Sequence, residues 1–291
     1  MSRTYASMFF VAMLLGVAPV VDAADTDAAA ETKFLGLTLA RGLAEPKIRS
    51  KPAEISYTRP DTGPSSATVD AGIEARIGLA WATSISEMAI GVEHHRNTAT
   101  ASKRDIVLAG IAATGGFVGA DGALNYRSSV KYKNDRNQGT RGLVAGIDLY
   151  PYIPTRLNAT AKLASDIYLT PTTSFGLQYE RANSGSVADT PGGSVFRGVA
   201  AAGLHFEIGP RWTTSLDVGY WRDTRQSGTF LGDEKSKIMR RVSLAYKLDD
   251  KGNASIALSR THGSDPNEGI VKEKYTQLVL QLNQNFFSAG K

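Results

Sequence analysis

The sequence predicts an all-β fold: a closed antiparallel transmembrane β-barrel of about 12 strands, with 12 to 14 as the range. Three observations predict it. Apolar and polar residues alternate through most of the chain, ionisable residues stand in the middle of the polar faces, and aromatic residues lie near the segment ends. The stretch 68–81, TVDAGIEARIGLAW, shows the first two, because Asp70, Glu74 and Arg76 share one face of an extended chain.

The N-terminus predicts export. Arg3 precedes an apolar run from Met8 to Val21, and residues 21–23, VDA, fit the small-x-small pattern of a signal-peptidase site. The run of about 14 residues is shorter than the roughly 20 that a transmembrane helix needs. We therefore interpret residues 1–23 as a cleaved signal peptide and residues 24–32, ADTDAAAET, as a flexible N-terminal lead-in.

The predicted barrel covers residues 33–287, and residues 288–291 form a C-terminal tail. Within the barrel, apolar residues recur at every second position in about 12 to 13 segments, which we interpret as tilted membrane strands of roughly 9 to 11 residues each. These segments are 34–41, 68–81, 88–92, 107–113, 124–132, 143–149, 157–169, 175–179, 196–208, 212–220, 242–248, 256–258 and 278–286.

The connections predict the two rims of the barrel. Short turns at TSISE, GADG, GPR and DDKGN tend to alternate with long polar connections such as KNDRNQGTR at 133–141. Transmembrane barrels show this asymmetry between periplasmic turns and outer loops. YIPT and TPTT, between Pro151 and Thr173, break the pattern as two short turns in succession. Because single-chain bacterial barrels normally have an even number of strands, the prediction is 12, with 14 left open.

The charged faces favour a membrane barrel over a soluble β-sandwich, which would also alternate. In a barrel the apolar face meets lipid and the polar face lines the lumen, and aromatic residues such as Tyr132, Tyr150, Trp212 and Trp221 form girdles at the interfaces. Arg240 is an exception, since it shares a phase with apolar neighbours and is expected at the outer interface. The predicted lumen-lining residues are Asp70, Glu74, Arg76, Glu93, Arg127, Lys131, Asp148, Lys162, Asp166, Arg197, His205, Asp217 and Arg241.

With this pattern the chain resembles the bacterial outer-membrane β-barrel proteins, in particular porin-like barrels of about 12 strands. The last segment, KYTQLVLQLNQNFF, is similar to the C-terminal signal of that family, although Phe287 is followed here by SAGK. The resemblance implies a place in the cell outer membrane, in contact with lipid and lipopolysaccharide. It also implies recognition of the C-terminal strand by the barrel-assembly machinery.

The leading prediction for function is a small porin-like channel for small polar solutes, without cofactors and without enzymatic activity. The sequence indicates neither the solute nor the oligomeric state. The net charge of +5 comes from scattered basic residues, which does not predict a nucleic-acid partner. His94 and His95 project to opposite faces of a strand, so they do not predict a metal site.

Two alternatives stay open. His262 and Ser264, with Asn267 nearby, are similar to the His-x-Ser-Asn arrangement of the outer-membrane phospholipases, which implies a lipid hydrolase with His262 activating Ser264. Here Ser264 is followed by Asp265, and the same residue types are common in loops. The second alternative is a surface binding or adhesion barrel with a closed lumen, which would use the loops around 133–141, 183–194, 223–236 and 262–273.

Overall fold

The computed structural model describes residues 32–42, 53–61, 65–79, 85–98, 103–184, 191–231, 233–250, 253–265, 270–282 and 284–287. The predicted signal peptide, the tail 288–291 and all but the last residue of the lead-in lie outside these residues. Among the described residues, no helix is long and apolar enough to cross a membrane.

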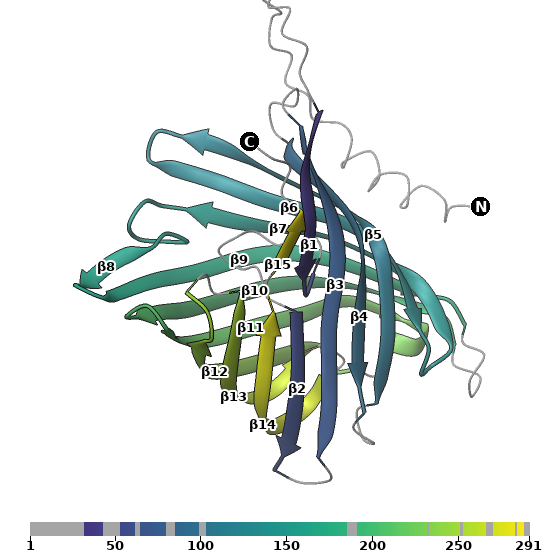
Figure 1. The fold of residues 1–291 in the computed structure, drawn as a ribbon. Helices are drawn as coiled ribbons and strands as arrows, with labels where there is room; N and C mark the ends of the chain where they lie inside the picture. Colours follow the sequence, from purple (N-terminus) through teal and green to yellow (C-terminus); the bar gives the residue numbers. More distant parts are fainter. Residues whose placement is uncertain are drawn as a thin grey trace, which may run out of the picture.

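The strands close into one antiparallel ring with 12 strand positions, because β4 pairs with β3 and completes the circle (Figure 1). This confirms the predicted fold class and strand number. From β3 to β14 each strand of the ring pairs with the next one, and β2 closes the ring because it pairs with both β14 and β3. The strands of the ring are β2 (Ala53–Pro60), β3 (Ser66–Leu79), β4 (Ile85–Asn97), β5 (Arg104–Gly119), β6 (Gly122–Asp135), β7 (Thr140–Tyr152), β9 (Ile167–Ala182), β10 (Gly193–Ile208), β11 (Trp212–Ser227), β12 (Ser236–Lys247), β13 (Ala254–Asp265) and β14 (Ile270–Leu282).

The seam of the barrel joins the two ends of the described chain. β1 (Thr32–Ala40) and β2 lie end to end along β3, where Ala40 pairs with Gly72 and Glu54 pairs with Asp70. On their other side, β2 pairs with β14 and β1 pairs with the short β15 (Gln284–Phe287) (Figure 1). Two strand positions are therefore each built from two chain segments. The strand β2 was not among the segments predicted from the alternation of the sequence.

We name the rims by the strands that end there. At the loop rim β2, β4, β6, β9, β11 and β13 end, and at the turn rim β3, β5, β7, β10 and β12 end. The predicted GADG turn is confirmed, because Gly119 pairs with Gly122 across a two-residue turn. The prediction of a long loop at KNDRNQGTR is wrong, because β6 continues to Asp135 and β7 begins at Thr140. The Asp135 carboxylate accepts hydrogen bonds from the backbone N–H groups of Asn137 and Gln138, both at 3.0 Å, which stabilises the tight turn.

The region 151–173 also differs from the prediction. The segment 157–169 is not one strand, because the chain reverses between β8 (Ala161–Ala164) and β9, and β8 pairs only with β9 outside the ring. TPTT is not a turn but part of β9. Buried Asn158 connects the sheet here: its amide donates to the carbonyls of Pro151 (2.6 Å) and Thr173 (2.8 Å) and accepts from the Thr173 N–H (2.9 Å). This side chain replaces backbone pairing that the hairpin interrupts.

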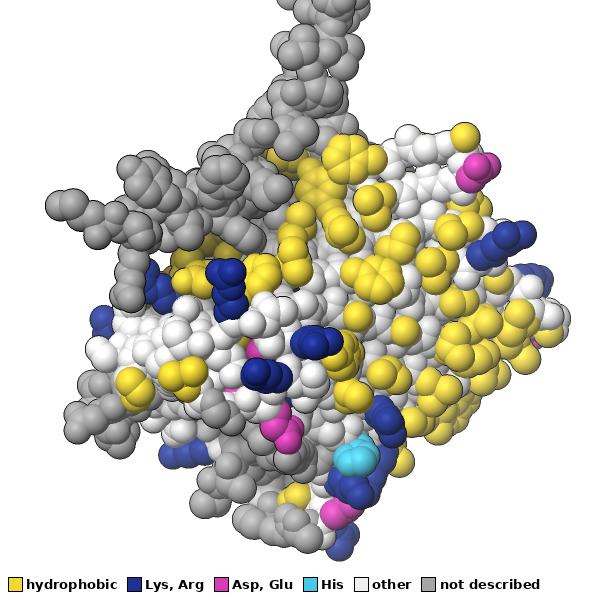
Figure 2. All heavy atoms as spheres, turned by 180° about the vertical axis from the view of Figure 1, so that it is seen from behind, with side chains coloured by type: hydrophobic (Ala, Val, Ile, Leu, Met, Phe, Trp, Pro, Cys, Tyr) yellow, Lys and Arg dark blue, Asp and Glu magenta, His cyan; other side chains and the backbone are white. Residues whose placement is uncertain are grey.

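The two faces of the wall have opposite polarity. On β3, Asp70 and Glu74 are buried on the inward face, whereas Ile73 is 51% exposed on the outward face. The same holds around the ring, where exposed Leu, Ile and Val side chains cover much of the outer wall (Figure 2). A closed sheet pairs all its backbone groups internally, so this wall is suited to lipid. The chain is a transmembrane β-barrel, and its exposed apolar band is in contact with lipid.

Candidate functional site: the lumen

The lumen holds a cavity of about 790 Å³, lined by side chains from most strands of the ring. Its wall is mixed in chemistry. Charged side chains come mainly from β4, β6, β7, β9 and β10, and small neutral polar side chains come mainly from β11 to β14. Aliphatic residues such as Leu108, Val144 and Val199 fill the positions between them. The wall of the cavity is therefore both polar and apolar, and its charge is distributed unevenly around the ring.

Asp70 is the centre of the first group of charges. Its carboxylate accepts from Arg104 Nη2 at 2.7 Å and from Arg41 Nη2 at 3.2 Å, and His95 Nδ1 lies 2.9 Å away. Arg41 also reaches Glu54 at 2.9 Å. The side chains of Asp70, Arg41 and Arg104 are almost fully buried. A carboxylate taken out of water needs such partners, because an unpaired buried charge is strongly destabilising.

Glu93 continues this group to the next strands. Its carboxylate accepts from Lys131 Nζ at 2.7 Å, and His95 Nε2 lies 3.4 Å away. His95 thus stands between the carboxylates of Asp70 and Glu93, while its neighbour His94 faces outward and contacts Asp105 at 2.9 Å. The two histidines point to opposite faces. Within the part of the chain that the structure describes, no group of three or more metal-binding side chains is arranged around one ion position.

A second group of charges lies around Arg197. The guanidinium contacts Asp223 at 3.1 Å and Glu180 at 3.7 Å, and its side chain is only 2% exposed. Lys133 pairs with Glu180 at 2.6 Å, and Lys237 pairs with Asp223 at 2.9 Å. We call both groups together the ion-pair belt. It consists of Arg41, Glu54, Asp70, Glu93, His95, Arg104, Lys131, Lys133, Glu180, Arg197, Asp223 and Lys237.

Two further sets of charges lie on the inward face nearer the turn rim. Arg127 pairs with Asp148 at 2.6 Å between β6 and β7, and both side chains are partly exposed to the cavity. Arg76 lies between Glu74, with which it forms an ion pair, and Glu87 at 3.1 Å. Arg127–Asp148 and Arg76–Glu87 cross-link neighbouring strands, whereas Arg76 and Glu74 lie on the same strand, β3. Arg127–Asp148 keeps more contact with water than the pairs of the belt around Asp70.

The neutral side of the lumen is a cross-strand row. Ser215, Ser243, Ser259 and Gln277 are direct neighbours on β11, β12, β13 and β14, and all four line the cavity. Ser215 and Ser243 share a hydrogen bond of 2.9 Å, and the Gln277 amide donates to Ser56 at 3.1 Å and to Thr58 at 3.0 Å. We call these four residues the neutral row. It presents hydroxyl and amide groups, which donate and accept hydrogen bonds without a net charge.

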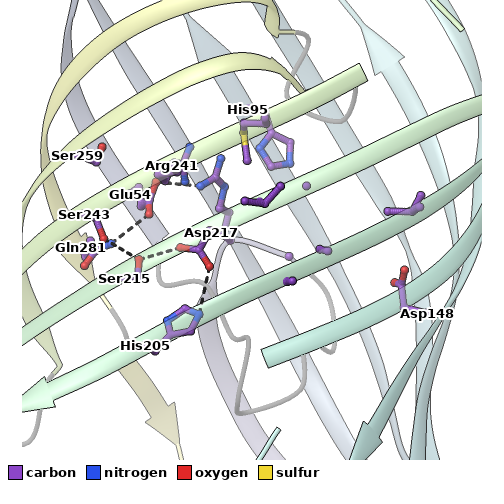
Figure 3. A pocket seen from close by; sticks show the side chains of 18 of the residues that line it. Glu54, His95, Asp148, His205, Ser215, Asp217, Arg241, Ser243, Ser259 and Gln281 are labelled. Atoms are coloured by element: carbon purple, nitrogen blue, oxygen red, sulfur yellow. Dashed lines mark hydrogen bonds and ion pairs between the residues drawn. The ribbon is translucent and has the colours of Figure 1, made fainter. Parts of the chain in front are cut away.

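His205 on β10 is the cross-strand neighbour of Ser215, and Asp217 lies two residues beyond Ser215 on β11, towards the loop rim. Asp217 accepts from the Ser215 hydroxyl at 2.7 Å and lies 3.1 Å from His205 Nε2. Figure 3 shows these side chains on neighbouring strands with Ser243, and Arg241 nearby. Arg241 donates to the Thr261 hydroxyl at 3.2 Å.

The predicted lumen residues are not all in the lumen. Asp70, Glu74, Arg76 and Arg197 lie on inward faces, and Glu93, Arg127, Lys131, Asp148, His205, Asp217 and Arg241 line the cavity. Lys162 and Asp166 do not, because Lys162 is exposed on β8 and Asp166 is exposed in the turn that follows it, outside the ring. Trp221, predicted in an aromatic girdle, is instead buried and lines the cavity, where its ring lies against Gly219.

Sequence reasoning missed several members of the belt and the whole neutral row. β9 continues beyond the predicted segment 175–179 and so includes Glu180, and β12 begins at Ser236, so Lys237 lies on a strand where a loop was expected. Arg41 and Glu54 lie at the junction of β1 and β2. Continued alternation would have located Glu180, but Ser and Gln on a strand carry no distinctive signal.

The two hydrolase candidates, His262 and Ser264, differ in their exposure. His262 is exposed on β13, whereas Ser264 is buried, and the pairing register shifts between Gly263 and Asp265. Gly263 has φ +120°, a conformation that favours glycine. Asn267 lies outside the described residues. This bulge does not present an exposed serine beside the histidine.

Comparisons with known proteins give only structural likenesses. No protein-family model and no curated protein matches the chain. The NanC porin is 7% identical, with 79% of this chain and 98% of the porin covered and a TM-score of 0.46. The KdgM porin is 10% identical, with 79% and 97% covered and a TM-score of 0.39. The β domain of the Bordetella autotransporter BrkA is 10% identical, with 85% and 98% covered and a TM-score of 0.39.

Proposed function

We propose that this protein is a small channel of the cell outer membrane that passes small polar solutes through the lumen. The observation that carries the proposal is the cavity of about 790 Å³ inside a closed ring of 12 strands, with charged and neutral polar side chains along its wall. Barrels of eight strands are filled by side chains, and barrels of 16 to 18 strands enclose wide aqueous channels, so a narrow lumen is expected at about 12 strands.

The surroundings of the barrel follow from the same proposal. Its apolar band would lie among outer-membrane lipids, with lipopolysaccharide in contact with the outer rim. The barrel-assembly machinery would recognise the strand position formed by β14 and β15. Support for this comes from the alternation of residues 274–287 and from the aromatic pair Phe286 and Phe287.

The direct test is the conductance of the purified full-length barrel in a planar lipid bilayer. We expect discrete conductance steps. Ser243→Trp should reduce their size, because Ser243 lines the cavity, whereas Leu244→Trp places the same ring on the lipid side of the same strand and should leave the conductance unchanged. A wild-type barrel whose gel mobility changes on heating, as that of a folded barrel does, but which shows no conductance would contradict the channel proposal.

A surface-binding function is less well supported by the loops. Three of the four predicted binding loops are clearly shorter than the sequence indicated, because β6 and β7 extend into 133–141, β11 and β12 into 223–236, and β13 and β14 into 262–273. The segment between β11 and β12 includes the short 3-10 helix η1 (Gly228–Phe230).

For the hydrolase alternative, we expect Ser264→Ala to leave any phospholipase activity of the preparation unchanged.

A further inference from the structure

Basic side chains gather on the outward face near the loop rim. Arg240 on β12, His262 on β13 and Lys274 on β14 are direct cross-strand neighbours, and all three are exposed. One step towards the turn rim, Arg260 on β13 and Arg59 on β2 are also exposed on the outward face, in the row that contains Thr276. Among these residues, the sequence placed only Arg240 at the outer interface and made His262 a candidate for catalysis.

The charge of this cluster is largely uncompensated. Asp61 is the carboxylate that pairs with it, at 2.5 Å from Arg260 Nη2. That hydrogen bond holds the pKa of the Asp61 carboxyl below its usual range, so it remains ionised. Among the described side chains, no ion pair joins Arg59, Arg240 or Lys274 to a carboxylate, although the charge of Lys274 also lowers the pKa of Asp61. Four basic side chains against one carboxylate leave the cluster with a net charge of about +3, and His262 adds a further nitrogen donor.

The polarity changes stepwise along the outer wall at this place. We compare three cross-strand rows that follow one another towards the loop rim. The first row is apolar and consists of Leu244, Leu258, Leu278 and Tyr57, each about half exposed. The next row mixes Val242 with Arg260 and Arg59, and the row after it holds Arg240, His262 and Lys274. Over three rows the surface passes from hydrocarbon to cation. Figure 2 shows, from behind, a broad apolar wall with basic side chains gathered toward its lower edge.

This gradient matches one kind of occupant. A lipid has acyl chains that cover the apolar row, and a headgroup that lies at the level of the basic row. A basic residue at the membrane surface attracts anionic headgroups, and an arginine that faces the bilayer is tolerated only near the interface. Arginine forms paired hydrogen bonds with phosphate oxygens, and lysine binds phosphate as a point charge.

We propose that Arg59, Arg240, Arg260, His262 and Lys274 form a binding site for the phosphorylated headgroup of a membrane lipid on the outer wall of β12, β13, β14 and β2. The acyl chains of that lipid lie along Leu244, Leu258 and Leu278. The site faces the bilayer and not the lumen, so it is independent of the channel proposed above.

The test titrates the detergent-solubilised full-length barrel with lipid A, a bisphosphorylated glucosamine lipid, and counts bound lipid by native mass spectrometry. Arg240→Gln combined with Lys274→Gln should weaken lipid A binding about thirtyfold, since each basic residue at the membrane surface contributes about five- to sixfold in affinity. The matched control is Arg141→Gln with Arg181→Gln, two exposed outward-facing arginines at the same rim on β7 and β9, which should change binding by less than about twofold.

A charge-preserving pair, Arg240→Lys with Lys274→Arg, should keep most of the wild-type affinity. Dephosphorylated lipid A should bind all variants weakly and equally. The proposal is overturned if the glutamine pair binds as wild type does, if the control pair loses as much affinity, or if phosphate removal has no effect. Should the glutamine pair fail to assemble, Lys274→Gln alone is expected to lose about fivefold, and wild-type affinity in that variant would equally overturn it.

Discussion

The ion-pair belt and the neutral row line the same lumen with opposite chemistry. In the belt, nearly every charge faces a partner from another strand, and several pairs span two strand positions, as Asp70 on β3 does with Arg104 on β5. In the neutral row, Ser215, Ser243 and Ser259 offer short hydroxyl side chains that take up little of the lumen. Charges in the belt are committed to joining strands, whereas the row carries no charge, and its hydroxyl oxygens keep acceptor capacity beyond the bonds that they make to their neighbours. The number of lumenal charges is therefore a poor measure of what the lumen selects.

The largest expected effect is at the centre of the belt. Asp70→Asn leaves Arg41, Arg104 and His95 buried beside a neutral amide, and we expect a loss of about 3 to 5 kcal/mol in the free energy of unfolding. The measurement is urea unfolding in detergent micelles, followed by tryptophan fluorescence. Asp148→Asn is the matched control, because its pair with Arg127 is more exposed, and it should cost clearly less. Equal losses at both positions would show that the belt is not special.

A smaller effect is expected in the neutral row. Gln277→Leu removes the hydrogen bonds to Ser56 and Thr58 and leaves two inward hydroxyls without that donor. We expect a cost of about 1 to 2 kcal/mol in the same unfolding experiment, because neutral hydrogen bonds contribute less than buried ion pairs. A cost as large as that of Asp70→Asn would contradict the distinction between the two regions.

The third effect is on selectivity and is smaller still. Ser259→Lys adds an unpaired charge to the neutral row, and one charge near a solute path at water-like screening contributes about 1 kcal/mol. We expect the anion-to-cation permeability ratio, taken from the reversal potential in a salt gradient, to rise about fivefold. Lys131→Gln in the belt should shift the ratio less. The comparison fails if the belt substitution has the larger effect.

The sequence predicted the barrel because alternation, mid-strand charges and aromatic ends are local signals. The strand number of 12, however, came from the rule that barrels have an even number of strands, because the count of 12 to 13 segments included 157–169 as an extra strand. β2 was missed because residues 53–60 alternate weakly, and 157–169 was taken as one strand because a hairpin reversal at residues 165–166 preserves the alternation. For the same reason Lys162 and Asp166 were placed in the lumen, although they lie outside the ring.

The organisation of the site could not be predicted, since it depends on register. Asp70 meets Arg104 across 34 residues of sequence, and Gln277 meets Thr58 across 219. Alternation assigns a residue to a face but does not say which residue of another strand lies beside it. The neutral row exists only once β11 to β14 are aligned, and Trp221 is distinguished from an interfacial aromatic only by the inward face it occupies.

The central claim is that solutes pass through the lumen along the neutral row. Because the chain has no cysteine, single cysteines can be introduced without background. A planar bilayer holding the Ser243→Cys barrel should show a stepwise drop in single-channel conductance when a cationic methanethiosulfonate reagent is added. The Leu244→Cys barrel, with its thiol on the lipid side, should show none. An unchanged conductance in the Ser243→Cys barrel, with labelling verified by mass, would contradict the account.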